Sequence, residues 1–389
     1  MDFDIAIVGG GIVGASLAAS LAESGHNVAL VERKPPPEPA PQWDSRIYTL
    51  TPASIGFLGG IGAWSRLPPE RITPVYDMQV FGDDGRSRLD FSAYEAGLPQ
   101  LAATIESGRL HRALWQGLER QRNLSLLCPA VPSTLRFTED GVEIGLDLGR
   151  AASARLLVGA DGADSWVRQA ARIEVRTASY EQLGVVANFS CARPHHNAAY
   201  QWFRSDGVLA YLPLPERRVS IVWSTSHAQA RSLLALPAAR FCERVSEAGS
   251  GALGRLELLT PPAAFPLGRM VSVRMGHERV ALIGDSAHVL HPLAGQGINL
   301  GLGDAHCLAD LLRGARDPGD RMLLRRFERS RAEDILALRW VTEGLFRLFD
   351  TDHAVIKRVR NLGLNLTNSN SVLKTLLARR ATTVGQGLH

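Results

Sequence analysis

Three glycines and one acid near the start of the chain have the types and spacing that bind a dinucleotide. Gly9, Gly11 and Gly14 follow the first apolar run, and Glu32 follows the second. In a strand–turn–helix–strand unit the first glycine permits a tight turn, the second lets the backbone approach a pyrophosphate, and the third lets helix and strand pack closely. An acid at position 32 would accept hydrogen bonds from ribose hydroxyls, which favours FAD or NAD over a phosphorylated ribose. A nucleotide-free α/β turn is the alternative.

Two later loops have residues that could face the same cofactor. Asp161 and Gly162 follow an apolar strand, and Gly284 and Asp285 end another. Asp285 would hydrogen-bond polyol hydroxyls. A helix that starts near Gly297 would direct the positive end of its dipole at a negatively charged cofactor centre.

Basic residues after the glycine turn are further candidates. The proline-rich segment 35–41 is too stiff for a helix and returns Arg46 towards the body of the protein. Arg46 could pair with a surface acid or contact a flavin or substrate. Glu106 and Arg109 stand at the start of a helix that the spacing of Leu110, Leu114 and Leu118 predicts.

Two histidines, His288 and His291, invite a metal hypothesis. No third ligand stands at a suitable spacing, so we predict no metal and interpret His291 and Pro292 as pocket wall. The four cysteines are far apart and indicate reduced, structural thiols in the cytoplasm.

Short β-rich runs between residues 183 and 225, with no helix between them, predict an antiparallel sheet in a second domain. Its aromatic residues could line a pocket for an apolar ring or fill the core; they are Tyr200, Trp202, Phe203, Tyr211 and Trp223. We take Trp202, Tyr211, Trp223 and Pro292 as the candidate substrate pocket.

Composition excludes several classes of protein. The chain has 389 residues, and 43 basic against 39 acidic side chains give a net charge of +4, too small for a dedicated nucleic-acid binder. No apolar run reaches the roughly 18 to 20 residues that span a bilayer. Acids at the N-terminus argue against an export signal. The basic, leucine-rich stretch 321–389 predicts helices with a solvated face, an anionic-lipid contact or a partner contact.

The three loops together resemble the FAD motifs of single-component flavin aromatic hydroxylases. More narrowly, the chain resembles the bacterial ubiquinone-biosynthesis hydroxylases of the UbiH/UbiF/VisC type, over nearly its whole length. The segments that carry this resemblance are Trp43–Arg46, Ala160–Gly162, Gly207–Pro213, Phe265–Leu267 and His288–Asn299. Ser286 stands where alanine is expected, a change that should be harmless, and the loop from Glu106 to Arg109 also departs from the usual pattern.

The resemblance implies an FAD monooxygenase that hydroxylates a polyprenylated phenol with O2, through a flavin C4a-hydroperoxide. It implies reduction by NAD(P)H or another electron donor, contact with other ubiquinone-biosynthesis proteins, and a cytoplasmic location with peripheral contact at the inner membrane. The implied catalytic residues are His291, Pro292 and Gly295. The implied cofactor-binding residues are Gly9, Gly11, Gly14, Glu32, Arg33, Arg46, Glu106, Arg109, Asp161, Asp285, Gly295, Gln296, Gly297, Ile298 and Asn299.

We therefore expect an α/β fold. A Rossmann-like FAD domain would comprise residues 1–72, 100–178 and 269–330, an inserted antiparallel substrate domain 73–99 and 179–268, and a helical C-terminal region 331–389. One alternative is a flavoprotein of the same fold with different chemistry, such as a reductase of prenyl chains or a hydroxylase of another aromatic or secondary metabolite. Another is a non-catalytic FAD-binding assembly subunit. A halogenase is disfavoured because the Trp-x-Trp-x-Ile-Pro segment is absent.

Overall fold

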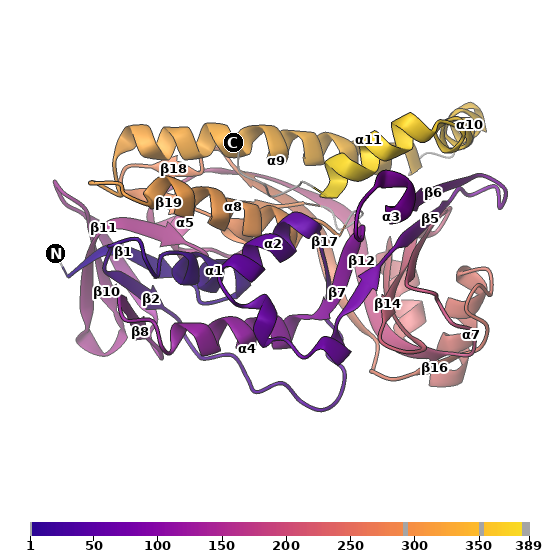
Figure 1. Cartoon of the computed structure of the whole chain (residues 1–389), viewed down its shortest axis with the longest axis horizontal. Helices are drawn as coiled ribbons and strands as arrows, with labels where there is room; N and C mark the ends of the chain where they lie inside the picture. The colour runs from indigo at the N-terminus through magenta and orange to yellow at the C-terminus, as the bar shows by residue number, and fades with distance from the viewer. Residues whose placement is uncertain (1, 291–294, 350–353, 383–389) are drawn as a thin grey trace.

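A parallel sheet forms the core of the first part of the molecule (Figure 1), and the computed structural model describes residues 2–290, 295–349 and 354–382. Its parallel strands lie in the order β19 (Val280–Leu282), β11 (Ala151–Gly159), β1 (Phe3–Val8), β2 (Val28–Val31) and β8 (Leu124–Leu127). The short β18 (Gly276–His277) pairs antiparallel with β19. Strands β1 and β2 are apolar throughout their buried lengths because both faces of the sheet are covered.

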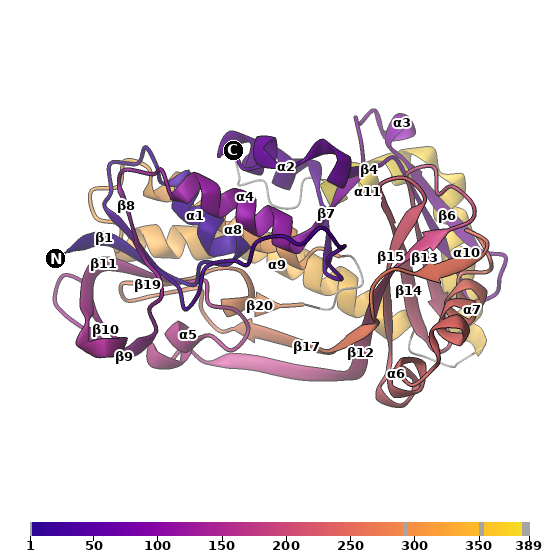
Figure 2. The ribbon, with the colours of Figure 1, turned by 90° about the horizontal axis from the view of Figure 1, so that it is seen from below.

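Helices cover one face of this sheet, and a β-extension covers the other (Figure 2). Helix α1 (Ile12–Ser20) contacts both α4 (Ser107–Leu118) and α8 (Gly297–Leu312). The leucines that predicted α4 are buried, which confirms the helix. The opposite side carries β9 (Pro132–Phe137), β10 (Val142–Leu146) and α5 (Trp166–Ala170).

A large sheet forms the second part. Its strands lie in the order β20 (His288–Val289), β17 (Ala263–Ser272), β12 (Val175–Cys191), β15 (Arg218–Ser226), β14 (Gly207–Leu214), β13 (Ala198–Arg204), β5 (Asp77–Phe81) and β6 (Arg88–Ser92), with β16 (Leu256–Leu258) beside β12. All these pairs are antiparallel, as expected, except that β5 runs parallel to β13.

A small sheet and two long strands connect the parts. The small sheet has the order β3 (Ile47–Leu50), β7 (Ala102–Glu106) and β4 (Thr73–Val75), so β4 does not pair with the large sheet. Strands β12 and β17 run through the expected boundaries near 178 and 268 in one ladder. Short helices in this region are α2 (Pro52–Gly60), α3 (Ala93–Ala96) and the 3-10 turns 64–66, 69–71, 147–149 and 284–286.

Alternation along the large sheet separates two faces. One face packs on α6 (His227–Leu234) and α7 (Ala238–Ala248), and its buried core includes Phe189, Tyr211, Ile221, Trp223 and Phe241. The Tyr211 hydroxyl donates a 2.6 Å hydrogen bond to the Val245 carbonyl of α7. Residues of the other parity, such as Val186, Ala210 and Val222, are only half-buried.

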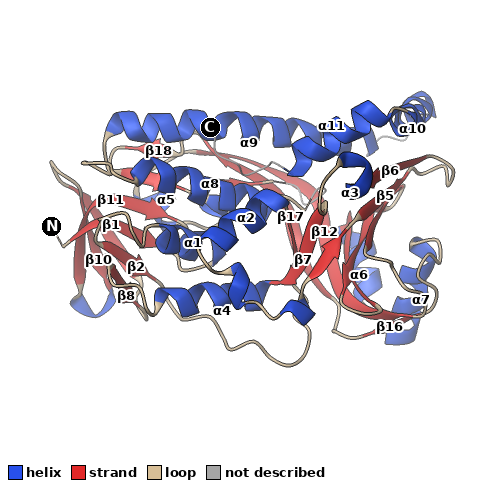
Figure 3. Ribbon diagram, viewed as in Figure 1, coloured by secondary structure: helices blue, strands red, loops and turns tan. Residues whose placement is uncertain are grey.

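The C-terminal region is helical, as predicted (Figure 3). Helix α9 (Arg321–Phe349) packs along α8, whereas α10 (Ala354–Ser369) and α11 (Ser371–Thr382) lie over β6 and α3. Within the described ranges, no helix combines the length and apolarity needed to cross a membrane.

Removal of the Tyr211 hydroxyl tests the packing between the large sheet and α7. The substitution Tyr211→Phe should lower the free energy of unfolding by about 0.5 to 1.5 kcal/mol, because it removes one buried hydrogen bond while the Val245 carbonyl still accepts the Gly249 N–H. Urea denaturation monitored by circular dichroism measures the change. An unchanged midpoint would contradict this account of the contact.

Candidate active site

The glycine turn between β1 and α1 needs glycine for two different reasons. Gly9 has φ = +105°, and a Cβ there would lie 2.4 Å from the Ala160 carbonyl oxygen. A Cβ on Gly14 would lie 2.0 Å from the Gly9 carbonyl oxygen. Gly11 has an ordinary φ of −64°, and a Cβ there would meet no atom within 4 Å. The open space at Gly11 lies at the N-terminus of α1, where a pyrophosphate would be bound.

Glu32 lies beside this turn, and two helix residues fix the turn from below. The Glu32 carboxylate accepts a 2.6 Å hydrogen bond from the Gly10 N–H, while Arg33 is exposed beyond it. His111 Nε2 and Trp115 Nε1 of α4 each lie 2.7 Å from the Gly10 carbonyl oxygen. Burial lowers the pKa of His111. Sequence analysis missed both side chains, although the periodicity of α4 places them one turn apart.

Glu106 holds the loop that carries Arg46. Its buried carboxylate accepts hydrogen bonds from the Asp44 N–H (2.9 Å), Arg109 Nε (2.6 Å) and Arg71 Nη1 (3.3 Å). Both oxygens are therefore used within the protein, and the structure places Glu106 and Arg109 as positioning residues of this loop. Their expected direct contact with a cofactor remains a prediction.

Arg46 and Tyr48, at the start of β3, lie close to Asp285 of the third loop. The Arg46 guanidinium lies 5.3 Å from the centre of the Tyr48 ring. Desolvation raises the pKa of Asp285, although the charges of His288 and Arg46 partly oppose the shift. Desolvation also raises the pKa of Tyr48. The sequence pattern indicated Arg46 and Asp285 but gave no signal for Tyr48.

Arg168 ties the second loop to the third. Its guanidinium donates to the carbonyls of Ser286 (2.9 Å) and Ala163 (2.8 Å). One oxygen of Asp161 accepts the Val167 N–H at 3.0 Å, and the other is buried without a partner in the described structure. The Ser286 hydroxyl lies 2.6 Å from the Gly159 carbonyl oxygen, so this departure from alanine joins two strand ends.

The start of α8 presents backbone rather than side chains. Gly295 has φ = +60°, and a Cβ on Gly297 would meet no atom within 4 Å. The Asn299 amide is used internally: Oδ1 accepts the Thr51 N–H at 2.9 Å, and Nδ2 donates to Thr49 and to Gln296. The Asn299 side chain thus positions the start of α8, and the contact of Asn299 with a cofactor remains a prediction. Ile298 packs against the core, and His291 and Pro292 lie outside the described residues.

A buried ionic network lies beneath the third loop. Asp304 of α8 bonds His288 Nε2 at 2.6 Å, Arg331 Nε of α9 at 2.8 Å and the Gly284 N–H at 2.9 Å. Burial alone would raise the pKa of Asp304, but the charges of His288 and Arg331 outweigh it and hold the pKa below its ordinary value. His288 therefore has a carboxylate partner, and no cluster of three potential metal ligands occurs among the described residues.

The candidate substrate aromatics do not line this region. Trp202, Tyr211 and Trp223 are buried in the core between the large sheet and the layer of α6 and α7, which corrects their interpretation as pocket residues. The opposite face of the same strands is turned to the loops, because Asn188 Nδ2 of β12 donates to the Asp44 carbonyl at 2.8 Å.

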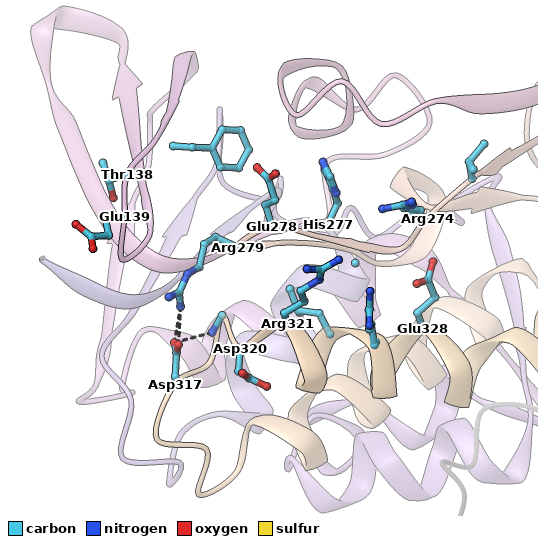
Figure 4. A pocket seen from close by; sticks show the side chains of 16 residues that line it. Thr138, Glu139, Arg274, His277, Glu278, Arg279, Asp317, Asp320, Arg321 and Glu328 are labelled. Carbon is cyan, nitrogen blue, oxygen red and sulfur yellow. Dashed lines mark hydrogen bonds and ion pairs between the residues drawn. The ribbon is translucent and has the colours of Figure 1, made fainter.

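A cavity of about 890 Å³ lies elsewhere (Figure 4). It is formed by the β9–β10 turn, the β18–β19 hairpin and the start of α9, and Arg279 pairs there with Asp317 at 2.6 Å. None of the candidate cofactor residues lines it.

The residues around the three loops fit a dinucleotide. Two helix N-termini with glycines that leave open space, an acid at the end of β2 and an unpartnered Asp161 oxygen provide the donors and acceptors that its phosphates and hydroxyls need. FAD would be held by Gly11 and Glu32 at its adenosine end and by Asp285 and the start of α8 at its flavin end.

Substitutions at Gly11 and Gly14 distinguish an effect on FAD binding from an effect on stability. Gly11→Ala should leave the free energy of unfolding of the flavin-free protein unchanged but lower its affinity for FAD, because the added methyl enters only the open space. Gly14→Ala should lower stability by about 1 to 3 kcal/mol, because the methyl meets backbone. Urea denaturation and FAD titration measure both effects. Equal losses of stability in the two variants would contradict this assignment.

The buried network should dominate local stability. Asp304→Asn should lower the free energy of unfolding by about 3 to 5 kcal/mol, because it leaves Arg331 buried without its main counter-charge. The matched change Asp310→Asn, at an exposed ion pair of the same helix, should cost less than about 1 kcal/mol.

The pH dependence of the Asp304 effect follows from its lowered pKa. The stabilisation is complete above the unfolded carboxyl pKa of about 3.9 and disappears as the pH falls through the folded value. The difference between wild type and Asp304→Asn should therefore be constant from neutral to mildly acidic pH and shrink only below about pH 4. A difference that shrinks already near neutral pH would rule out this carboxylate as the source.

Comparisons with known proteins agree with this geometry. A family model described as an FAD binding domain matches residues 2–338. The ubiquinone hydroxylase UbiL of Rhodospirillum rubrum is 36% identical over 97% of this chain and 89% of its own length. The 3-demethoxyubiquinol 3-hydroxylase of Escherichia coli is 35% identical over 95% of this chain and 96% of its own. The human ubiquinone biosynthesis monooxygenase COQ6 is 30% identical over 96% and 91%, respectively.

Solved structures share the fold. The p-nitrophenol 4-monooxygenase PnpA of Pseudomonas putida superposes with a TM-score of 0.80 at 16% identity and covers 99% of this chain and 98% of its own. PqsL of Pseudomonas aeruginosa, a probable FAD-dependent monooxygenase, gives 0.77 at 23% identity over 93% and 99%. The matches in sequence are the decisive ones: the chain belongs to the FAD-binding family that includes the ubiquinone-biosynthesis hydroxylases, and it is an FAD-dependent monooxygenase.

Proposed function

We propose that this monooxygenase hydroxylates the aromatic ring of a polyprenylated phenol in ubiquinone biosynthesis. The observation that carries the proposal is a sheet face, left uncovered by α6 and α7, that contacts the segment of Arg46 through Asn188. The names of the most similar relatives support the pathway. When bound, FAD would supply the oxygen chemistry itself, so the protein needs to orient the ring and exclude water.

A row of small apolar side chains is the wall that we assign to the substrate. Val186, Val222 and Ala210 are register partners on β12, β15 and β14, and all three are half-buried. Because side chains alternate along a strand, they have the opposite direction to Tyr211 and Trp223. Asn188, of the same parity as Val186, reaches the loop of Arg46. This row thus lies on the sheet face that contacts the segment of Arg46.

The electron donor is NAD(P)H or another reductant that binds transiently, since the chain has one glycine fingerprint and FAD occupies it in this proposal. A prenylated substrate also favours a cytoplasmic protein with peripheral contact at the inner membrane and with other ubiquinone-biosynthesis proteins.

Mass spectrometry of quinone intermediates in a deletion strain tests the function. The strain should accumulate a polyprenyl phenol that lacks one hydroxyl, and wild-type protein should clear it. Ala210→Trp should fail to clear it while it retains FAD, because the indole would fill the substrate wall. Tyr211→Phe, a change on the other face of the same strand, should clear it.

An unchanged profile after deletion would overturn the pathway and move the assignment to another aromatic substrate. Clearance by Ala210→Trp at the wild-type rate would instead overturn the assignment of the substrate wall.

A further inference from the structure

Helix α10 turns a polar face towards the protein. Asn365 Oδ1 accepts the Arg88 N–H at 3.2 Å, and Asn368 Oδ1 accepts the Asp90 N–H at 3.0 Å. Asn361 Nδ2 adds a 3.0 Å bond to Asp83. Strand β6 is the edge of the large sheet, and alternate N–H groups of an edge strand need partners. Asn365 and Asn368 satisfy two of these groups, and Asn361, four residues before Asn365, lies on the same helix face.

The consequence is that apolar residues of α10 and α11 face outwards. Leu362 and Leu366 of α10 are 58% and 62% exposed, and Val372 and Leu376 of α11 are 78% and 64% exposed. A surface helix ordinarily buries its apolar face against the body of the protein. We call these four side chains the outer apolar surface; both helices lie at one end of the molecule, above β6 and α3 (Figure 1).

The same helices cover the end of the proposed substrate wall. Leu364 of α10 packs against the cluster that contains Phe203, and Val208 packs there as well. Val208 precedes Ala210 by one alternation on β14, so both lie on the sheet face opposite to Tyr211. Apolar side chains of this face therefore extend from Ala210 through Val208 to Leu364 of α10.

Charge identifies the surface that α10 and α11 would meet. Residues 354–389 contain six basic residues and no aspartate or glutamate: Lys357, Arg358, Arg360, Lys374, Arg379 and Arg380. Of these, Lys374 pairs with Glu95 at 3.1 Å and Arg380 with Glu333 at 3.7 Å. Exposed leucines within a basic, acid-free segment match an anionic lipid surface, where apolar insertion and attraction to headgroups add. Like charge disfavours a second copy of this chain at the same surface.

We propose that the outer apolar surface of α10 and α11 docks on an anionic phospholipid bilayer and brings the end of the sheet face to the lipid. The docking stands on the exposed leucines and the charge, whereas its use for prenyl-chain entry rests on the proposed function. The asparagine contacts fix the rotation of α10: its polar face lies against β6, and its leucines are therefore directed outwards.

Cosedimentation of the full-length protein with phosphatidylglycerol–phosphatidylcholine vesicles tests the docking. Wild type should bind, more weakly at high salt and with phosphatidylcholine alone. The triple change Leu362→Ser, Leu366→Ser and Leu376→Ser should weaken binding by about tenfold or more. Leu148→Ser, at a 92% exposed leucine in the β10–β11 turn, is the matched control and should bind as wild type does.

Absence of vesicle binding by wild type, or equal binding by the triple variant, would overturn the proposal. So would size-exclusion chromatography that shows a wild-type dimer and a monomeric triple variant, because a second copy would then cover the surface.

A comparison of two substrates separates docking from catalysis. The triple variant should hydroxylate a water-soluble phenol with a short prenyl chain at the wild-type rate but lose most activity on a long-chain phenol in vesicles. A wild type that binds vesicles yet hydroxylates neither phenol would overturn the proposed function and leave the docking surface in place. A triple variant equally active on the long-chain phenol would overturn the entry path.

Discussion

The structure around the cofactor loops depends on one buried carboxylate. Asp304 receives hydrogen bonds from His288, from Arg331 and from the Gly284 backbone, and so joins the third loop, α8 and α9 at one point. A buried charge is tolerated only when it is paired and hydrogen-bonded, so these elements must keep their relative positions. The dipole at the start of α8 can act on a cofactor only because this network fixes the helix from below.

The loops are also held by one another. Arg168 joins the second loop to the carbonyl of Ser286 in the third, and Ser286 closes the ends of two neighbouring strands. Glu106 likewise fixes the segment before Arg46, because its carboxylate accepts hydrogen bonds from the Asp44 N–H and from Arg109. Most polar side chains of these motifs thus stabilise loop geometry, and the cofactor would meet mainly backbone N–H groups, Glu32 and Asp285. A binding site made of backbone depends on such positioning because it has few side chains to adjust.

The sequence was sufficient for the elements whose pattern is local. Glycine spacing predicted the turn at Gly9, and leucine spacing predicted α4, because both reflect nearest-neighbour geometry. It failed for Trp202, Tyr211 and Trp223, because the period of a strand is visible in a sequence but the identity of the face it turns to a partner is not. It gave no sign of the internal hydrogen bonds of Asn299 and Glu106, whose partners lie about 250 and 60 residues away in the chain. Composition cannot show whether such a side chain is free for a ligand or already bonded.

Helix α10 shows the same difficulty in reverse. Leucines at helical spacing normally mark the face that packs on the core. Here Asn365 and Asn368 take that place because the sheet edge offers backbone N–H groups rather than an apolar surface. What a helix buries is decided by the surface that receives it, and an edge strand selects amide side chains. The exposed leucines of α10 are then available to contact a lipid bilayer. Because Leu364 of the same helix packs against the sheet face, such a contact would bring the bilayer close to the place where an apolar substrate could enter.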